Sequence, residues 1–314
     1  MNVLSSPRRQ VEPVPSSKPL IEQLAMGFGV VTPFIGLIAA IVLLWGAGVG
    51  WTQVLLLIGF YTFTILGVTI GFHRMFTHRA LEGGPTLRFI LAIAGSMSAQ
   101  GPVIEWCALH RAHHKHSDRD GDPHSPHLQG HGILGLLKGM WHSHVGWLFS
   151  AEPAANPAAV ADLLADPVLL FVDRLFWLWM LAGWIIPGVI AGLLLHSWAG
   201  ALTGVIWGGL VRTFLLHHVT WSINSVCHVW GTQPFGQRDQ SRNNPLFGVL
   251  AFGEGWHNNH HAFPTSARHG LQWWQMDLTW WTIRLLEKLR LVWNVRIPSS
   301  SAIEARRAVP IGED

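Results

Sequence analysis

Long apolar stretches without acidic or basic residues alternate with polar segments along this chain. Each of the four longest is long enough to cross a hydrocarbon core of about 30 Å as a helix. They cover residues 27–51, 52–72, 176–195 and 199–219, the last being uncharged apart from one arginine. This pattern predicts four membrane-spanning helices and an all-α integral membrane protein.

Three further features refine this pattern. The fourth stretch contains Arg212, and a charge inside a span normally faces the helix bundle, a cavity or the membrane surface. A shorter apolar run at 87–97 predicts an interfacial or re-entrant helix, because it is too short to cross the bilayer. The tryptophan-rich, amphipathic segment 271–295 is expected to lie on the membrane surface.

The spans define one domain with polar tails on either side. We expect residues 1–26 to form a disordered N-terminal tail, residues 27–298 to form the membrane domain, and residues 299–314 to form a C-terminal tail. The first tail is rich in Pro and Ser and lacks the short apolar core and cleavage site of a signal peptide. We therefore expect it to remain attached.

The distribution of basic residues predicts the orientation of the chain. Arg8, Arg9 and Lys18 precede the first span, whereas the short connections within each pair of spans contain no Lys or Arg. By the positive-inside rule both termini are cytoplasmic, and the long segments after the second and fourth spans lie on the same side. These segments form a predicted cytoplasmic helical cap.

The composition agrees with a membrane protein and excludes other classes. Hydrophobic residues make up 49% of the chain and charged residues only 12%. The 21 basic and 18 acidic residues leave a net charge of +3, too small for a surface that follows nucleic-acid phosphates. Two cysteines are too few for a disulfide framework or a four-thiolate metal site. The 19 histidines, in contrast, are a rich supply of metal ligands.

Nine of these histidines form four local patterns. They are H-x4-H at 73–78, H-x2-HH at 110–114 and again at 257–261, and N-x3-H at 224–228. The i, i+3, i+4 spacing of the two triplets places three imidazoles on one helical face. Crowded imidazoles of this kind need an electron acceptor, which a metal supplies. Nine imidazoles exceed the four ligands of one zinc ion, so the pattern indicates two metals of higher coordination number, with iron the natural candidate.

The other histidines are interpreted as packed or hydrogen-bonded groups. Isolated ones are His196, His217, His218 and His269. Those crowded after the second cluster without helical spacing are His116, His124, His127, His131, His142 and His144. Neutral imidazole ligands also need hydrogen-bond acceptors behind them. Candidates for that role are Glu254, Asp118, Asp120, Asp122 and Asp277.

Five short segments give the chain a family resemblance. They are FHRMFTHR (72–79), HRAHHKHSD (110–118), DPHSP (122–126), NSVCH (224–228) and FGEGWHNNHHAFP (252–264). Together they resemble the integral-membrane fatty acid desaturases, and within that family the stearoyl-type delta-nine branch in its bacterial and cyanobacterial form. The resemblance extends from about residue 50 to 298.

The resemblance implies a histidine-bound di-iron site. The implied iron ligands are His73, His78, His110, His113, His114, His228, His257, His260 and His261. Spacing alone indicates eight of them, and His228 is assigned through the resemblance. The family also implies that Asn224 holds a metal-bound water and that Trp106, Thr220 and Trp221 shape a substrate tunnel. From the residues alone, packing in the core or at the membrane interface would be favoured for these tryptophans.

The activity implied by the resemblance is O2-dependent desaturation of a fatty acyl chain, with the delta-nine position expected. It consumes an acyl chain, O2, two protons and two electrons and yields a cis alkene and two waters. The electrons must come from outside, because the chain has no HPGG haem motif, cysteine cluster or dinucleotide fingerprint. A ferredoxin or a cytochrome-b-type protein with its reductase is the expected donor. Basic residues proposed to steer it are Arg74, Arg79, Arg111, Lys115, Arg238, Arg242 and Arg268.

Two features concern the substrate. Tyr61 and Ile65 share one face of the second span, and we expect them either to close the far end of the tunnel or to pack in the core. Animal acyl-CoA desaturases carry an Arg–Asp pair where this chain has Ala108 and Leu109. This difference favours an acyl chain esterified to lipid as the substrate, while acyl-CoA stays open. The expected location is a bacterial inner membrane.

Two alternatives to this function remain open. A related di-iron hydroxylase, or a desaturase of different regiochemistry, would use the same ligands. A non-catalytic membrane metal-binding protein is a more distant alternative, because it would carry its ligands inside the spans rather than at their ends.

Overall fold

The chain folds into a predominantly helical structure, seen in a computed structural model that describes residues 19–44, 49–150, 157–236 and 238–307. The α-helices are α1 (Leu20–Leu44), α2 (Trp51–Leu66), α3 (Pro85–Ser96), α4 (Val103–His116), α5 (Gly132–His144), α6 (Ala161–Leu164), α7 (Pro167–Arg174), α8 (Phe176–Leu195), α9 (Trp198–Gly204), α10 (Arg212–Asn224), α11 (Pro245–Leu250), α12 (His257–Ala262), α13 (Leu278–Lys288) and α14 (Ser300–Arg307). Two π-helices, η1 (Gly67–Thr77) and η4 (Val205–Val211), continue α2 and α9. Short 3-10 turns are η2 (Gly146–Phe149), η3 (Pro157–Val160) and η5 (Val226–His228), and the two short strands are β1 (Glu82–Gly83) and β2 (Val292–Trp293).

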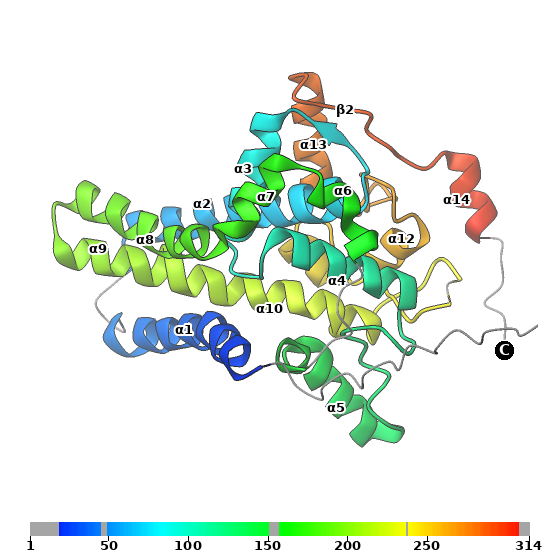
Figure 1. Cartoon of the computed structure of the whole chain (residues 1–314), viewed down its shortest axis with the longest axis horizontal. Coiled ribbons are helices and arrows are strands. Elements are labelled where there is room, and N and C mark those ends of the chain that lie inside the picture. Colours follow the sequence, from blue (N-terminus) through cyan, green and yellow to red (C-terminus); the bar gives the residue numbers. More distant parts are fainter. Residues whose placement is uncertain (1–18, 45–48, 151–156, 237, 308–314) are drawn as a thin grey trace, which may run out of the picture.

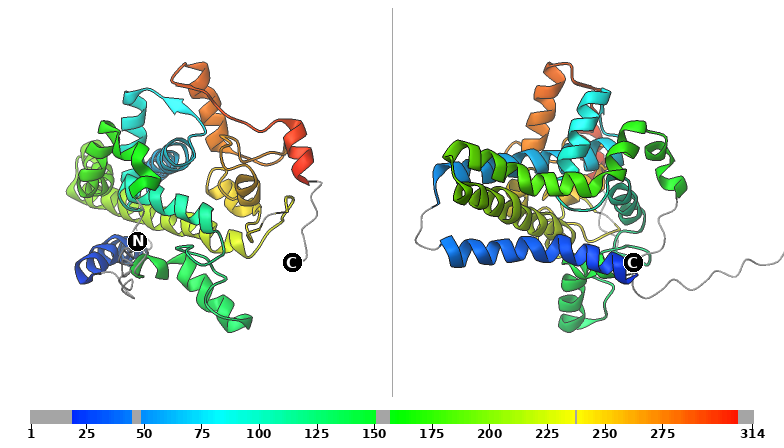
Figure 2. Two further views of the ribbon diagram at one scale, coloured as in Figure 1. Left: turned by 45° about the vertical axis from the view of Figure 1, so that its right-hand side comes forward. Right: turned by 60° about the vertical axis from the view of Figure 1, so that its left-hand side comes forward.

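Four helical segments are long and apolar enough to cross a membrane, as predicted. They are Leu20–Val42, Trp51–Thr77, Phe176–Leu195 and Trp198–His228. Figure 1 shows them running side by side in roughly one direction, with α4 and α12 grouped towards one end and the α8–α9 turn at the other. The same arrangement is visible in the two turned views of Figure 2.

The helix boundaries differ from the uncharged stretches of the sequence. The first helix begins at Leu20, inside the expected tail, because the Pro19 carbonyl accepts hydrogen bonds from the amides of Glu22 and Gln23 at 3.0 Å. Trp51 begins the second helix, whose first turn is closed by a hydrogen bond from the Gln53 amide to the Gly50 carbonyl. Backbone hydrogen bonds therefore start both helices earlier than the uncharged stretches predict.

The tails fall largely outside the described residues. Residues 1–18 and 308–314 lie outside them. The disorder expected for residues 1–26 is wrong for residues 20–26, because these residues form the first turns of α1. Part of the expected C-terminal tail is the helix α14.

Arg212 faces the helix bundle, one of the positions expected for a charge within a span. Its side chain is fully buried. It donates hydrogen bonds to the carbonyls of Met97 at 2.9 Å, Gly183 at 2.8 Å and Gly208 at 3.2 Å. The guanidinium thereby joins the segment after α3 to two of the spanning helices and satisfies carbonyls that would otherwise be buried without partners.

The short helix expected near residues 87–97 is α3, which packs closely on η1. A Cβ atom at Gly67 would lie 2.2 Å from the Gly95 amide nitrogen, so the two backbones approach within a distance that only glycine permits. Just before α3 in the chain, β1 pairs antiparallel with β2, with Glu82 opposite Trp293. This pair ties the segment after η1 to the C-terminal part of the fold.

Candidate metal centre

The first two histidines lie on a π-helix, which brings them together. Residues five apart in an α-helix point about 140° away from each other at 100° per residue. In η1 the His78 amide bonds the His73 carbonyl at 3.1 Å, the i→i+5 pattern of a π-helix. The wider turn brings the two side chains to one side, and their rings lie edge to face with centroids 4.9 Å apart. The H-x4-H spacing thus gives two ligands on one side because the helix is locally a π-helix.

The two histidine triplets each divide their side chains between two sites. On α4, His110 and His114 are four residues apart and point to one site, while His113 points to the other. On α12 the division is reversed: His257 and His261 share the second site and His260 belongs to the first. Each triplet therefore lies between two clusters, and its i, i+3, i+4 spacing serves both.

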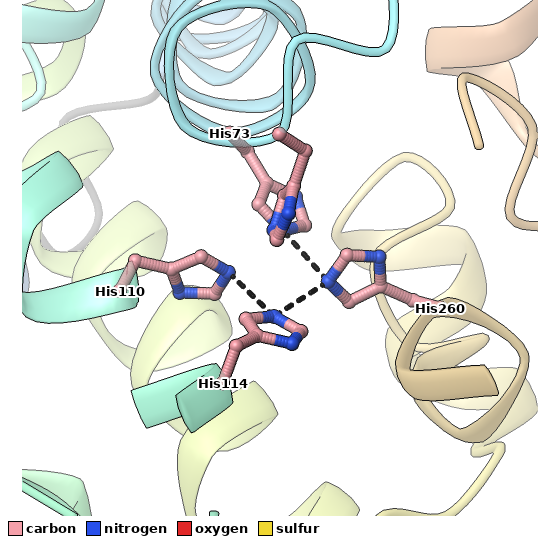
Figure 3. A group of neighbouring side chains, drawn as sticks. His73, His110, His114 and His260 are labelled. Carbon is pink, nitrogen blue, oxygen red and sulfur yellow. Dashed lines mark hydrogen bonds between the residues drawn. The ribbon is translucent and has the colours of Figure 1, made fainter. Parts of the chain in front are cut away.

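The predicted histidines come together as two compact groups. The five-histidine group is His73, His78, His110, His114 and His260, and the four-histidine group is His113, His228, His257 and His261. Within each group the candidate ligand atoms all lie within 4.8 Å of one another. Figure 3 shows four members of the first group, with their rings pointing towards a common centre.

The nitrogen atoms that meet in these groups are mostly Nε2. His260 Nε2 lies 3.0 Å from His73 Nε2 and 2.9 Å from His114 Nε2. In the second group His228 Nε2 lies 3.0 Å from His257 Nε2. A neutral imidazole donates through one nitrogen only, so converging Nε2 atoms cannot all satisfy one another by hydrogen bonding.

Four carboxylates hold the opposite nitrogen of four of these rings. They form the pairs His73 Nδ1 with Glu254 at 2.5 Å, His113 Nδ1 with Asp122 at 2.9 Å, His228 Nδ1 with Asp118 at 2.8 Å, and His261 Nδ1 with Asp239 at 3.1 Å. A carboxylate that accepts the Nδ1 proton fixes the tautomer, orients the ring and leaves the Nε2 lone pair for a metal. This arrangement is typical of metal-binding histidine.

Burial favours the neutral, metal-binding form of four of these imidazoles. It lowers the pKa of His110, His114, His257 and His260 well below the usual histidine range, with neighbouring histidines adding to the effect. Burial alone would raise the pKa of Asp122, but His113 beside it outweighs that cost and the pKa lies below its usual range. These neutral rings, together with the rings paired to carboxylates in the same groups, form an electron-rich donor set.

Several ring nitrogens also lack any partner within the described part of the chain. Nε2 of His78, His113 and His261 is buried without a hydrogen-bond partner. A buried polar atom without a partner is costly, and a bound cation at the centre of each group would satisfy these atoms. The residues present therefore fit two metal ions.

A buried arginine supports the first group from behind. Arg74 is fully buried and donates hydrogen bonds to Glu254 at 3.0 Å, to Asp277 at 3.0 Å and to the Ala267 carbonyl at 2.7 Å. Burial opposes ionisation of Glu254, but His73 and Arg74 together hold its pKa below the usual range. Arg74 is thus part of the support of the site and is too deeply buried to meet a donor protein, contrary to the steering role expected for it.

The acidic residues differ partly from those expected. Glu254, Asp118 and Asp122 support histidines as predicted, whereas Asp277 binds Arg74 and Asp120 is exposed. Asp239 supports His261, yet it lies in a polar loop far from any histidine in sequence. Nothing in its sequence surroundings distinguishes Asp239, because the contact depends on how this loop folds back over α12.

One histidine interpreted as packing lies directly beside the site. The His269 ring is fully buried, 4.5 Å from the His260 ring, and its Nδ1 lies 3.5 Å from Glu254. Together with His73 and Glu254 it forms a further set of closely spaced donor atoms. His269 is a single histidine in its segment, so spacing offered no signal for it.

An apolar cavity opens beside the five-histidine group. Trp106, Thr220, Trp221 and Asn224 line it, and so does His110. Trp106 stacks on His110 with centroids 5.1 Å apart. The three tunnel residues implied by the family resemblance therefore share one cavity with a histidine of the first group.

A glutamine not singled out from the sequence joins two of these residues. Gln100 also lines the cavity, donates a hydrogen bond to Thr220 at 3.1 Å and accepts one from the Trp106 indole at 3.4 Å. It thereby fixes the two side chains relative to each other.

Tyr61 and Ile65 lie away from this cavity lining. The Tyr61 hydroxyl donates to the Leu250 carbonyl at 2.8 Å, and its ring packs on Phe252. Ile65 is a buried core residue. The cavity is bounded instead by residues of α1 and α8, including Met26, Gly29 and Met180.

Comparison with known proteins gives the family. The family model for fatty acid desaturase matches residues 49–295, most of the chain. A hex-5-enoyl-[acyl-carrier protein] acetylenase of Moorena producens is 47% identical over 280 residues, covering 88% of this chain and 87% of that protein. An sn-1 stearoyl-lipid 9-desaturase of Anabaena variabilis is 42% identical over 234 residues, covering 74% of this chain and 79% of that protein.

A plant relative has a different stated specificity. The chloroplastic palmitoyl-monogalactosyldiacylglycerol delta-7 desaturase of Arabidopsis thaliana is 39% identical over 256 residues, covering 80% of this chain and 64% of that protein. The names of these relatives thus differ in the bond formed and in the group that carries the acyl chain.

Proposed function

Because this chain belongs to the fatty acid desaturase family, whose named relatives are oxidoreductases, we propose that it introduces a cis double bond at the delta-nine position of a saturated acyl chain esterified to membrane lipid. The observation that carries the proposal is the pair of histidine groups, backed by four carboxylates, beside an apolar cavity. The 42% identity to a stearoyl-lipid 9-desaturase supports this choice of bond and substrate.

The two histidine groups would each hold one iron ion. The nine imidazoles supply nitrogen ligands and no negative charge, and Asn224 would hold a water beside the four-histidine group. When bound, the two irons would accept electrons from the external donor and activate O2 for the removal of two hydrogens from the acyl chain, chemistry that no side chain performs alone. Overall, the acyl chain, O2, two electrons and two protons would give an alkene and two waters.

The chain's own residues position the substrate. The cavity excludes water from the methylene groups, and the stacked Trp106 and His110 rings form its boundary with the first histidine group. Its enclosed volume of about 70 Å³ is well below the roughly 300–1,000 Å³ of ordinary ligand pockets. We therefore propose that α1 and α8 move apart to admit a long acyl chain.

The carrier group and the product distinguish the alternatives. The absence of the Arg–Asp pair at Ala108 and Leu109 favours a lipid ester over acyl-CoA. The acetylenase similarity makes formation of a triple bond, or use of an acyl chain on a carrier protein, a second candidate. A hydroxylase would use the same site but transfer oxygen to the acyl chain in place of the second hydrogen abstraction.

We further propose that both termini and the histidine groups face the cytoplasm of a bacterial inner membrane. The Lys and Arg residues of the N-terminal tail support this orientation. An external ferredoxin or cytochrome-b-type donor would deliver electrons on that side. Of the basic residues considered for steering it, Arg79, Lys115 and Arg238 are exposed.

Product analysis tests the reaction. The chain is expressed in a bacterial host whose own desaturase is deleted but whose electron donors remain, and lipids are separated by headgroup before gas chromatography–mass spectrometry. We expect new monoenes with the double bond at carbon 9, located by derivatisation and found first in intact lipid. Hydroxylated or triple-bonded chains would establish an alternative reaction, and unchanged lipids with a metal-loaded protein would favour a non-catalytic metal-binding protein.

A substitution in the cavity tests the substrate site. Gly29 lines the cavity, and a Cβ atom there would meet nothing within 4 Å. We expect Gly29→Leu to occupy space needed by the acyl chain and to shift products towards shorter chains. One methylene of lost fit is worth roughly 1–3 kcal/mol, so the kcat/KM ratio of longer to shorter substrates should fall by about tenfold or more.

Gly27 provides a matched control for this substitution. It lies two residues away on α1, also has open space at its Cβ and does not line the cavity. Gly27→Leu should leave chain-length preference unchanged. Equal effects of the two substitutions, or no effect of either, would contradict the assignment of the cavity to the acyl chain.

A further inference from the structure

Helix α5 carries an apolar face that no described part of the protein covers. Ile133, Leu134, Leu137 and Trp141 are 68%, 69%, 58% and 70% exposed. At 100° per residue these four side chains fall within an arc of about 100°. Lys138 follows at the edge of the arc and is also exposed. A stripe of this kind on one side of a helix is typical of a surface that contacts another apolar phase.

The opposite face of α5 is fixed to the protein by close backbone contact. Gly135, Gly139 and Ser143 are buried there. A Cβ atom at Gly139 would lie 1.8 Å from the Pro126 carbonyl oxygen, and one at Gly135 would lie 2.4 Å from the Gly130 carbonyl. Because only glycine allows this approach, α5 cannot rotate to bury its apolar stripe against the rest of the chain.

The C-terminal end of α5 is held by polar contacts with the fourth span. His144 Nδ1 lies 3.0 Å from Ser225 Oγ, and His144 Nε2 lies 2.9 Å from His218 Nδ1. The turn η2 follows at once, and its Trp147 and Leu148 line the cavity. The orientation of α5 is therefore coupled to a wall of the substrate cavity.

The position of α5 relates its stripe to the spanning helices. Figures 1 and 2 show α5 projecting from the body of the molecule beside the Leu20 end of α1 and running across the direction of α1. At that end of α1, Leu20, Ile21 and Leu24 are 71%, 74% and 60% exposed, as expected of a helix surrounded by lipid. A helix crossing the direction of the spans at one of their ends lies along the membrane surface.

We propose that α5 is a membrane-interface helix whose stripe of Ile133, Leu134, Leu137 and Trp141 inserts into the bilayer leaflet around the Leu20 end of α1. The stripe continues the lipid-facing surface of α1, and Trp141 and Lys138 are residue types that favour the headgroup region. The occupant is thus the lipid bilayer. The inference rests on the membrane placement of the four spans and not on the reaction catalysed.

Site-directed spin labelling in lipid nanodiscs tests this proposal. Both native cysteines, Cys107 and Cys227, are buried, so a label can be directed to a newly introduced cysteine. Leu134→Cys and Leu137→Cys place the label on the stripe. Power saturation then compares access of O2, which concentrates in lipid, with access of a water-soluble nickel complex.

Two reference positions define the scale. Leu24→Cys on α1 reports a lipid-facing site, and Glu304→Cys, at an exposed position of the polar helix α14, reports water. We expect labels at 134 and 137 to have an O2-to-nickel access ratio several-fold above that at 304 and close to that at 24.

Two results would overturn the inference. Nickel access at 134 and 137 equal to that at 304 would place the stripe in water. Low access to both reagents with spin–spin broadening would instead show a second copy of the chain covering it. If the label at 24 also behaved as in water, the membrane placement itself would be wrong, whereas the proposed reaction would be unaffected by the first two results.

Discussion

Replacing His260 by alanine is expected to reduce desaturation below detection and to remove about one of the two proposed metal ions per chain. His260 Nε2 lies 3.0 Å from His73 Nε2 and 2.9 Å from His114 Nε2, so its ring is where ligands from η1, α4 and α12 meet. The four-histidine group does not use His260 and keeps all its members. Because the proposed reduction of O2 would use both metals, loss of one should abolish turnover.

Metal content and product formation are measured on the same purified protein. The number of metal ions per protein chain is determined by elemental mass spectrometry, and the products are determined by gas chromatography of the lipids. His131→Ala is the matched control, because His131 is exposed and its side chain makes no cap hydrogen bond. Full activity in His260→Ala, or complete loss of both metals, would contradict the division into two independent groups.

Periodicity and spacing predicted the parts of the fold that depend on local sequence. The four spans follow from apolar length, and the histidine clusters follow from spacing that repeats within a single helix. What spacing did not indicate is how a cluster divides: the histidines of α4 point to both groups, because α4 lies between them. The π-helix that brings His73 and His78 to one side was not predicted, although an α-helix does not place residues five apart on one side.

The supporting residues depend on contacts between distant segments. Asp239 reaches His261 from a loop, and His269 reaches Glu254 from another segment, so neither has a local pattern. The surroundings of Tyr61 and Ile65 likewise depend on contacts between distant segments. Their shared helical face follows from spacing, but which neighbour that face meets depends on the arrangement of the whole bundle. Neither side chain lines the cavity formed by α1, α8 and α10, and their place at the far end of a tunnel stays a prediction.

Replacing Arg74 by methionine is expected to destabilise the protein by about 3–5 kcal/mol, the cost of removing one partner from a buried ion pair. The change removes the only guanidinium that donates to both Glu254 and Asp277 among the described residues. Both acidic side chains are nearly buried, at 11% and 2% exposure. Left without Arg74, Glu254 would protonate more readily and hold His73 less firmly, so metal affinity should fall as well.

Arg79→Met is the matched control, since it removes an arginine from the same segment. Arg79 pairs with Asp162 at 2.8 Å, but its side chain is 62% exposed, and exposed pairs contribute about 0–1 kcal/mol. The free energy of unfolding is measured by titration with sodium dodecyl sulfate in mixed micelles, on metal-free protein. Arg74→Lys should recover only part of the loss, because an ammonium cannot replace the planar fork that reaches both carboxylates. Equal losses for Arg74→Met and Arg79→Met would show that the buried network contributes no more than a surface pair, and would remove Arg74 from the support of the site.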